Sequence, residues 1–281
     1  MVIEPTTDFR RFGFSFLAEP LAPFVRLHRH DEIEFGMVEG GAIRAMFGAR
    51  TLRIPPERLL IFWAGQPHGP VAVDPGVTAY AIHVPLAQVL DWNLPAPLTK
   101  GLLHGDVLLP RNPGSTLPDG LLMRHWISLM KAEREEQRAI VLLELEARLR
   151  RLACEGTYRL KEESLAERSR SSGGQAGQFE RIARIAAERC RDPLSVREIA
   201  QSVSLHPNYM MRLFRQVSGM TILEYLAQQR VGHAQRLLAT TDLKIIDVAL
   251  ESGFGSVCRF YKIFRKHCGA TPRRYREALR R

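Results

Sequence analysis

Four side chains near the N-terminus could bind a metal ion. His28, His30 and Glu34 lie within one seven-residue run, and His68 follows a later apolar segment. Residues of equal parity on a β-strand point to the same face, so the first three would share a face, and a later strand could bring His68 opposite them. Three imidazoles and one carboxylate suit Zn, Fe, Mn or Ni. These four residues are therefore candidate ligands of a divalent metal.

The same region could instead hold an organic effector, and the two interpretations are compatible. Histidines also serve as hydrogen-bonding groups in ligand pockets. Trp63 and Tyr80 could stack on a sugar ring, although an aromatic residue in a β-rich domain more often belongs to the core. The candidate effector contacts are His28, His30, Glu34, Trp63, His68, Tyr80 and His83.

A second group of side chains, in the last hundred residues, could read DNA. On a helix in the major groove, Arg can contact guanine and Asn can contact adenine through paired hydrogen bonds. The candidate base readers are Asn208, Arg212, Arg259 and Lys262. The candidate phosphate contacts are Ser204, His206, Ser256 and Arg265. Each of them, taken alone, could equally be a solvated side chain.

The charge distribution supports a polyanion partner for this part of the chain. Residues 178–281 hold 19 Lys and Arg against 9 Asp and Glu, whereas residues 1–177 hold 21 of each kind. The formal charge of +10 therefore belongs to the C-terminal third. A basic surface can also be merely solvated, so charge alone does not decide for nucleic acid.

An internal repeat organises the C-terminal part. Leu194, Ile199 and Ala200 match residues 49 positions later, and Phe214 and Gly219 match residues 50 positions later. One residue inserted in a turn reconciles the two offsets. Each unit has the plan of a short helix, a tight turn, a second helix and a glycine stop, which is the plan of a helix-turn-helix.

Local signals agree with this plan. Ser195 and Glu198 form a capping-box pattern, and Pro207 suits the first turn of the next helix. In the second unit, Gly253 offers the positive φ of a tight turn and Ser256 can cap the helix after it. Residues 222–238 are typical of one long helix that joins the units.

The N-terminal elements have a different character. Short β-type runs at 24–38, 42–47, 59–63 and 79–84 are separated by Gly and Pro turns, which favours a small barrel or sandwich. Residues 121–154 become helical in pattern. Their apolar stripe, which either covers the β-domain or meets its twin in a homodimer, consists of Leu142, Leu145, Leu149 and Leu152.

The length of 281 residues favours two domains. The small, polar, glycine-rich segment 164–178 predicts a linker between domain 1–163 and domain 179–281. We expect no signal peptide and no membrane span, because no apolar run approaches about 18 residues. The four cysteines form no Cys-x-x-Cys pair, which favours reduced thiols in a cytoplasmic protein.

From Gly253 through the Phe-Tyr-Lys-Ile-Phe-Arg-Lys run at 260–266 to Arg276, the sequence closely resembles the signature of AraC/XylS transcription regulators. The resemblance covers residues 179–278. It implies that two units enter successive major grooves of promoter double-stranded DNA, and that the protein often acts as an activator contacting RNA polymerase. The DNA contacts that it implies are Asn208, Met211, Arg212, Ser256, Cys258, Arg259 and Lys262. Met211 and Cys258 depart from the polar residues common there, and Arg215 is a further outward-facing candidate.

Residues 28–34 and the pair Gly65 and His68 resemble the family's cupin-like effector domain. One stretch, 60–68, is similar to a sugar-responsive member of the family, which implies a sugar effector. The expected fold class is thus α+β: a cupin-like β-barrel with helices, used for effector binding and dimerisation, followed by an all-α domain with two helix-turn-helix units. Two rivals remain: a metal-dependent cupin enzyme fused to DNA-binding units, and a β-domain that binds nothing and serves only in dimerisation or partner contact. Because no phosphate-cradling loop or nucleophile elbow is present, we expect a regulator and not an enzyme.

Overall fold

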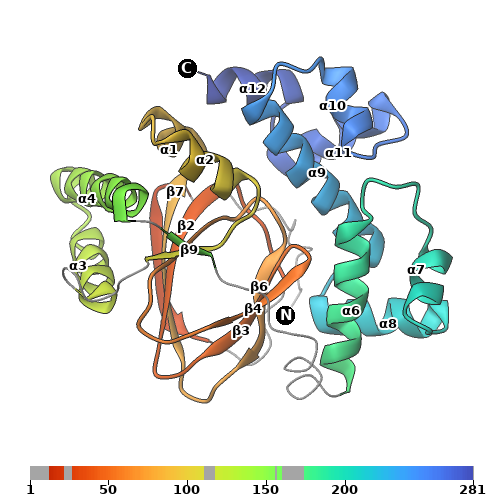
Figure 1. Cartoon of the computed structure of the whole chain (residues 1–281), viewed down its shortest axis with the longest axis horizontal. Coiled ribbons are helices and arrows are strands. Elements are labelled where there is room, and N and C mark those ends of the chain that lie inside the picture. Colours follow the sequence, from red (N-terminus) through yellow and green to blue (C-terminus); the bar gives the residue numbers. More distant parts are fainter. Residues whose placement is uncertain (1–12, 22–26, 111–117, 156, 160–173, 281) are drawn as a thin grey trace.

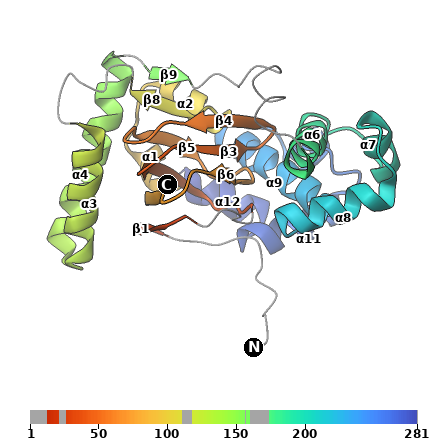
Figure 2. The same cartoon turned by 90° about the horizontal axis from the view of Figure 1, so that it is seen from below.

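The computed structural model describes residues 13–21, 27–110, 118–155, 157–159 and 174–280. The β-domain comprises residues 13–159 and the helical domain comprises residues 174–280. Residues 164–173 of the predicted linker lie outside the described residues, Gly174 is the N-cap of helix α6 (Gln175–Glu188), and residues 175–178 belong to that helix. The β-domain lies between a helix pair, α3 and α4, and the helical domain, as both views show (Figures 1 and 2).

The β-domain contains two antiparallel sheets. The larger has the order β1-β7-β2-β5-β8-β9 and consists of β1 (Ser15–Pro20), β7 (Thr78–Pro85), β2 (Glu32–Glu39), β5 (Leu60–Trp63), β8 (Leu108–Pro110) and β9 (Thr157–Arg159). The smaller has the order β4-β3-β6 and consists of β4 (Arg50–Ile54), β3 (Ile43–Phe47) and β6 (His68–Val73).

The expected barrel is not closed. Within the described part of the chain no ladder joins the two sheets, and the bridge between His28 and His68 links β6 only to the segment that leads into β2. Apolar side chains fill the space between the sheets, with Phe47, Leu52 and Phe62 among them. The two-sheet arrangement thus corrects the barrel while keeping the α+β class.

The described part of this domain also has four helices after β7, with β8 between the second and third and β9 after the fourth: α1 (Leu86–Asp91), α2 (Ala96–Leu103), α3 (Asp119–Lys131) and α4 (Glu135–Glu155). Leu145, Leu149 and Leu152 of α4 are fully buried in the cluster that contains the outer face of the larger sheet. The leucine stripe therefore covers the β-domain. Leu143, on the opposite side of α4, is 66% exposed.

The helical domain has the predicted repeat. Its first unit is α7 (Val196–Ser202) and α8 (Pro207–Ser218), its second is α10 (Ile245–Glu251) and α11 (Val257–Cys268), and α9 (Ile222–Thr240) joins them. Helix α12 (Pro272–Leu279) ends the described chain. No described helix combines the length and apolar character that a bilayer span requires.

The expected local signals of the helical domain are confirmed. Ser195 and Glu198 form both bonds of the capping box, and the Ser256 side chain accepts a hydrogen bond from the backbone of Arg259. Gly253 has φ +79°, and a Cβ there would lie 2.6 Å from the Cα of Arg191. Only glycine fits this turn, because both the conformation and the space exclude a side chain.

The two domains are closely packed against each other. Leu27 and Met46 of the β-domain belong to the same buried cluster as Phe179 and Tyr225 of the helical domain. A Cβ at Gly232 of α9 would lie 2.6 Å from the carbonyl oxygen of Gly65. Helix α9 is therefore both the connection between the two helix-turn-helix units and the main surface that meets the β-domain.

Candidate effector site and DNA-binding surface

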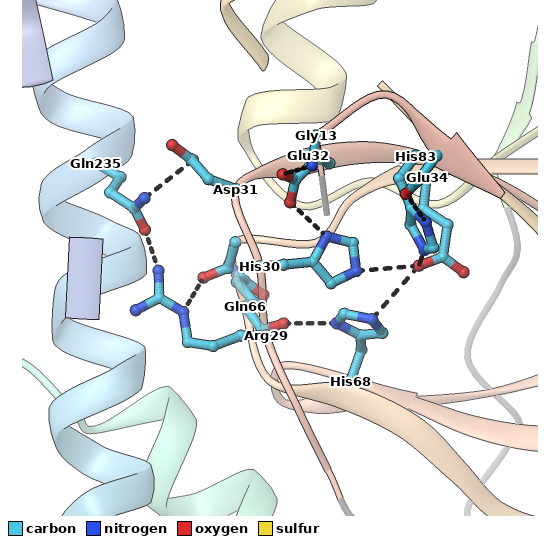
Figure 3. Close-up of polar contacts among 12 residues, drawn as sticks. Gly13, Arg29, His30, Asp31, Glu32, Glu34, Gln66, His68, His83 and Gln235 are labelled. Atoms are coloured by element: carbon cyan, nitrogen blue, oxygen red, sulfur yellow. Dashed lines mark hydrogen bonds and ion pairs between the residues drawn. The ribbon is translucent and has the colours of Figure 1, made fainter. Parts of the chain in front are cut away.

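Three imidazoles converge on one carboxylate in the β-domain. The Oε2 atom of Glu34 lies 3.2 Å from His30 Nε2, 3.6 Å from His68 Nε2 and 3.7 Å from His83 Nε2. Strand register explains part of this, because Glu34 of β2 is paired with His83 of β7 and the two side chains share a face. Figure 3 shows the convergence.

The other ring nitrogen of each histidine is held by a separate group. His30 Nδ1 is 3.0 Å from Glu32 Oε2, His68 Nδ1 is 3.0 Å from the Gln66 carbonyl oxygen, and His83 Nδ1 is 3.2 Å from Ser15 Oγ. Such outer partners fix the orientation of a ring and leave Nε2 directed at the centre of a site. The buried His68 Nε2 makes no hydrogen bond shorter than 3.5 Å to a described residue, and at 3.6 Å from Glu34 Oε2 it is directed at the centre of the cluster.

The protonation states follow from burial and from these contacts. Burial would raise the pKa of Glu34, but the contacts with His30 and His68 hold it well below its ordinary value. Burial lowers the pKa of His30, yet hydrogen bonds to Glu32 and Glu34 outweigh this effect and raise it. Burial lowers the pKa of His83 to about 4. At neutral pH the cluster therefore holds an ionised carboxylate and a neutral His83.

The separations suit a first-row metal. With bonds of about 2.0–2.1 Å, the ligand atoms of a tetrahedral site lie about 3.3 Å apart, close to the 3.2–3.7 Å between Glu34 Oε2 and the three Nε2 atoms. Two three-residue groups bring their ligand atoms within 4.8 Å of one another: His28, His30 and His68, and His30, Glu34 and His83. The residues present thus fit a divalent metal.

The structure brings together five of the seven predicted effector contacts. The His28 ring lies 4.4 Å from that of His68, centroid to centroid, which places it beside the three imidazoles. Trp63 and Tyr80 lie elsewhere: Trp63 is paired with Ile33 and is buried in the core beneath the helices, and Tyr80 donates a hydrogen bond to Glu39. His83 was expected only as an effector contact, and its parity with Glu34 makes it a candidate metal ligand as well.

The segment that carries the histidines also holds the helical domain. His30 points into the cluster, whereas Arg29 and Asp31 point to Gln235 of α9 (Figure 3). Asp31 Oδ1 accepts hydrogen bonds from Gln235 Nε2 at 2.9 Å and from Tyr275 Oη at 2.6 Å. Sequence reasoning missed Arg29 and Asp31, although their parity, opposite to that of His28 and His30, was a usable signal.

A buried ion pair adds a second contact between the domains. Arg44 Nη2 of β3 lies 3.0 Å from Glu180 Oε2 of α6, and both side chains are almost fully buried. Tyr225 Oη of α9 donates to the Gly48 carbonyl oxygen at 2.8 Å. The domain interface thus combines apolar packing with polar contacts, and the buried charges of Arg44 and Glu180 are paired.

The predicted DNA contacts lie on the exposed side of the helical domain. All are exposed: Ser204, His206, Asn208, Met211, Arg212, Arg215, Ser256, Cys258, Arg259, Lys262 and Arg265. His206 and Ser256 are the N-caps of α8 and α11, so the residues that follow them occupy the first turns, from which such helices read bases. The Arg212 guanidinium lies over the Tyr209 ring, 5.8 Å from its centroid.

Comparisons with known proteins agree with both parts. The AraC-like ligand binding domain family matches residues 19–153, and a helix-turn-helix domain family matches residues 199–278. The melibiose operon regulatory protein of Escherichia coli (strain K12) is 25% identical over 273 residues, covering 96% of this chain and 89% of that protein. The transcriptional activator RhaR of Escherichia coli O1:K1 / APEC is 37% identical over 95 residues, covering 34% of this chain and 33% of that protein.

Among solved structures, the DNA-binding domain of the transcriptional factor AdpA, in complex with a target DNA, is 32% identical. It covers 37% of this chain and 93% of that chain, with a TM-score of 0.35. The family matches, the resemblance along almost the whole chain and the paired helix-turn-helix units lead to one conclusion. The chain is an AraC-type DNA-binding transcription regulator with an AraC-like ligand-binding domain.

Proposed function

We propose that a small-molecule effector binds at the histidine cluster and changes how the helical domain is docked on the β-domain, and so changes promoter binding. The observation that carries this proposal is the alternation along residues 28–31. His30 faces the cluster, while Asp31 is bonded to Gln235 and Tyr275. An effector that moves this segment would act directly on the contact between the domains. It can shift the docking equilibrium only as far as its affinities for the docked and undocked arrangements differ.

The proposed effector is a sugar. The support is the similarity to a regulator of the melibiose operon along almost the whole chain. The cluster offers imidazoles and a carboxylate, which are suitable partners for hydroxyl groups. The regulator would act in the cytoplasm at promoter DNA and contact RNA polymerase there.

We also propose that the protein is a homodimer. Leu143 and Ile140 are 66% and 44% exposed on the side of α4 that faces away from the β-domain. A second copy of α4 is the occupant that would bury them. Sedimentation of the full chain tests this: Leu143→Arg should yield monomers, and a monomeric parent protein would contradict it.

A divalent metal is the proposed cofactor of the cluster. The metal would be held by His30, Glu34 and His83, whose ligand atoms lie close together. The Nδ1 atoms of His30 and His83 are already bonded to Glu32 and Ser15, which leaves each Nε2 atom for the metal. When bound, the metal would supply a Lewis-acidic centre for oxygen atoms of the effector. His28 and His68 form the rival group with the same His30.

Metal content distinguishes these groups. The full-length protein, purified without chelators, would be measured by elemental mass spectrometry after loading with Zn²⁺ and dialysis. His30→Gln and His83→Gln should lose the metal, and His28→Gln should retain it. Retention in all three variants would refute the site, and loss in His28→Gln with retention in His83→Gln would assign the other group.

The regulatory proposal is tested with DNA. The full chain would select its binding sequence from a random pool, and its affinity for that sequence would be measured with and without melibiose and other sugars. Asp31→Asn should still bind the sugar but should show a smaller change of DNA affinity. The matched control is Asp74→Asn, because among the described residues the Asp74 carboxylate accepts its hydrogen bond within the β-domain, from the backbone of Ala42. An equal sugar response in both variants would contradict the proposed route.

A further inference from the structure

A cavity of about 440 Å³ lies between the two domains, and none of the clustered histidines lines it. The β-domain contributes Gln66 and His104 to its wall. The helical domain contributes Arg191 from the loop after α6 and Arg236 from α9. Its volume is within the range of about 300–1,000 Å³ typical of small-molecule sites.

The cavity contains two arginines without a carboxylate partner among the described residues. The Arg191 side chain makes no hydrogen bond or ion pair with any of them. The polar contact of Arg236 within the same part of the chain is to the ring of His233, 2.9 Å from Nδ1. Burial lowers the pKa of Arg236, and the charge of Arg191 lowers it further. An anion between the two guanidinium groups would relieve this repulsion.

Neutral donors complete the wall. Burial lowers the pKa of His233 to about 4, and Arg236 and Arg191 contribute to this, so the ring is neutral at pH 7. Gln229 lines the cavity at 6% exposure, and its side-chain amide lies beside the Tyr225 hydroxyl. Glu188, the acidic residue of the wall, is exposed. Arg191 is exposed as well and Arg236 is half-buried, so the two positive side chains of the wall outnumber its one carboxylate.

We propose that this cavity is a second ligand site, which binds the phosphate or carboxylate group of a small anionic metabolite. Arg presents a planar fork of N–H donors that matches such oxyanions with paired hydrogen bonds. Since Arg236 lies on α9 and Gln66 lies in the β-domain, a bound anion bridges the domains and stabilises the docked arrangement. The two sites share Gln66, whose side chain belongs to the cavity wall and whose carbonyl oxygen holds His68 of the cluster, but the proposed anion does not depend on the effector proposed for the cluster.

The test uses full-length protein without DNA. Inorganic phosphate and glucose 6-phosphate would be titrated by calorimetry at constant ionic strength. Glucose is the control for binding of an uncharged sugar, and chloride is the control for binding of an anion without oxygen atoms. A higher affinity for glucose 6-phosphate than for inorganic phosphate would identify a phosphorylated metabolite as the ligand. Citrate, titrated in the same way, tests whether the ligand is a carboxylate instead.

Three variants give the expected pattern. Arg236→Gln should weaken phosphate binding at least about tenfold, since a charge-assisted pair is lost. Glu188→Gln should strengthen it, because a nearby negative charge is removed. The matched control Arg273→Gln, at a side chain that is 81% exposed, should change nothing.

Two results would overturn the proposal. One is an equal affinity for phosphate in Arg236→Gln and Arg273→Gln, which would show that the cavity does not hold the anion. The other is unchanged phosphate binding together with weaker DNA binding in Arg236→Gln, which would assign this guanidinium to the DNA backbone.

Discussion

Tyr275→Phe should loosen the docking of the helical domain on the β-domain. Tyr275 Oη donates to Asp31 Oδ1 at 2.6 Å and is buried at 4% exposure. The substitution removes this donor and keeps the aromatic ring, which packs edge-on against Phe264 at 5.5 Å between centroids. The substitution therefore removes one hydrogen bond between the domains, to Asp31, and the one that the hydroxyl accepts from Gln235 Nε2 at 3.1 Å within the helical domain.

The magnitude follows from the charge of the acceptor. A hydrogen bond to a charged group contributes about 1.5–3 kcal/mol, so the docked-to-undocked ratio should fall about 10- to 150-fold. Gln235 Nε2 remains 2.9 Å from the same carboxylate oxygen, which favours the lower part of that range. The matched control is Tyr225→Phe, which removes a hydrogen bond to the neutral Gly48 carbonyl and should cost only about 0.5–1.5 kcal/mol.

The chain supplies its own positions for the assay. Cys154 and Cys258 are exposed and lie in different domains, whereas Cys190 and Cys268 are buried. A donor and an acceptor dye on the two exposed thiols would report the distance between the domains by single-molecule energy transfer. Low urea concentrations would bring both arrangements into the measurable range.

The order of the two tyrosine variants decides the outcome. Tyr275→Phe should populate the undocked arrangement at a lower urea concentration than Tyr225→Phe. An equal or smaller effect of Tyr275→Phe would refute the argument that the Asp31 carboxylate secures the interface.

Three further substitutions test other parts of the structure. Arg259→Ala should weaken specific DNA binding by about 1–3 kcal/mol, measured on the selected site, if it reads a base. Gly232→Ala should shift the energy-transfer signal toward the undocked arrangement, because its Cβ would lie 2.6 Å from the carbonyl oxygen of Gly65. His267→Gln should flatten the pH dependence of the free energy of unfolding between pH 6.5 and 4. Burial lowers the pKa of His267 to about 4, so protonation of the unfolded chain below pH 6.5 reduces stability by up to about 3 kcal/mol at pH 4.

Controls with the same chemical change accompany these variants. Arg273→Ala should leave DNA affinity unchanged, and an identical loss in both Arg variants would point to net charge instead of a specific contact. Gly255→Ala, where a Cβ would meet nothing within 4 Å, should leave the domains docked. A pH profile of His267→Gln that parallels the parent profile would contradict the role of this histidine.

The helical domain could be predicted closely from sequence because its signals are local. The capping box at Ser195, the turn glycine at Gly253 and the apolar period each act within one or two helical turns. The parity of His30 and Glu34 predicted a shared site, since strand geometry alone sets which side chains share a face. These features need no knowledge of the partner elements.

Features that depend on contacts between distant segments could not be predicted. Whether the sheet closes depends on strand pairings that periodicity does not specify, and Trp63 and Tyr80 were assigned to the effector site by residue type alone. Gly232 lowers the helix propensity of residues 222–238, and only the structure shows that its lack of a side chain permits close contact with Gly65. Gln228 and Gln235, buried on α9, were the overlooked sign that this helix has a second partner.

The buried pair Arg44 and Glu180 has a consequence for protein engineering. Regulators are often treated as interchangeable modules, with the sensor of one fused to the DNA reader of another. Here, a transplanted β-domain that lacks the arginine would remove the ion-pair partner at 3.0 Å from the buried Glu180 carboxylate, at a cost of about 3–5 kcal/mol. A working chimera must carry both halves of each contact that crosses the boundary, so the unit of exchange is the pair of residues and not the domain.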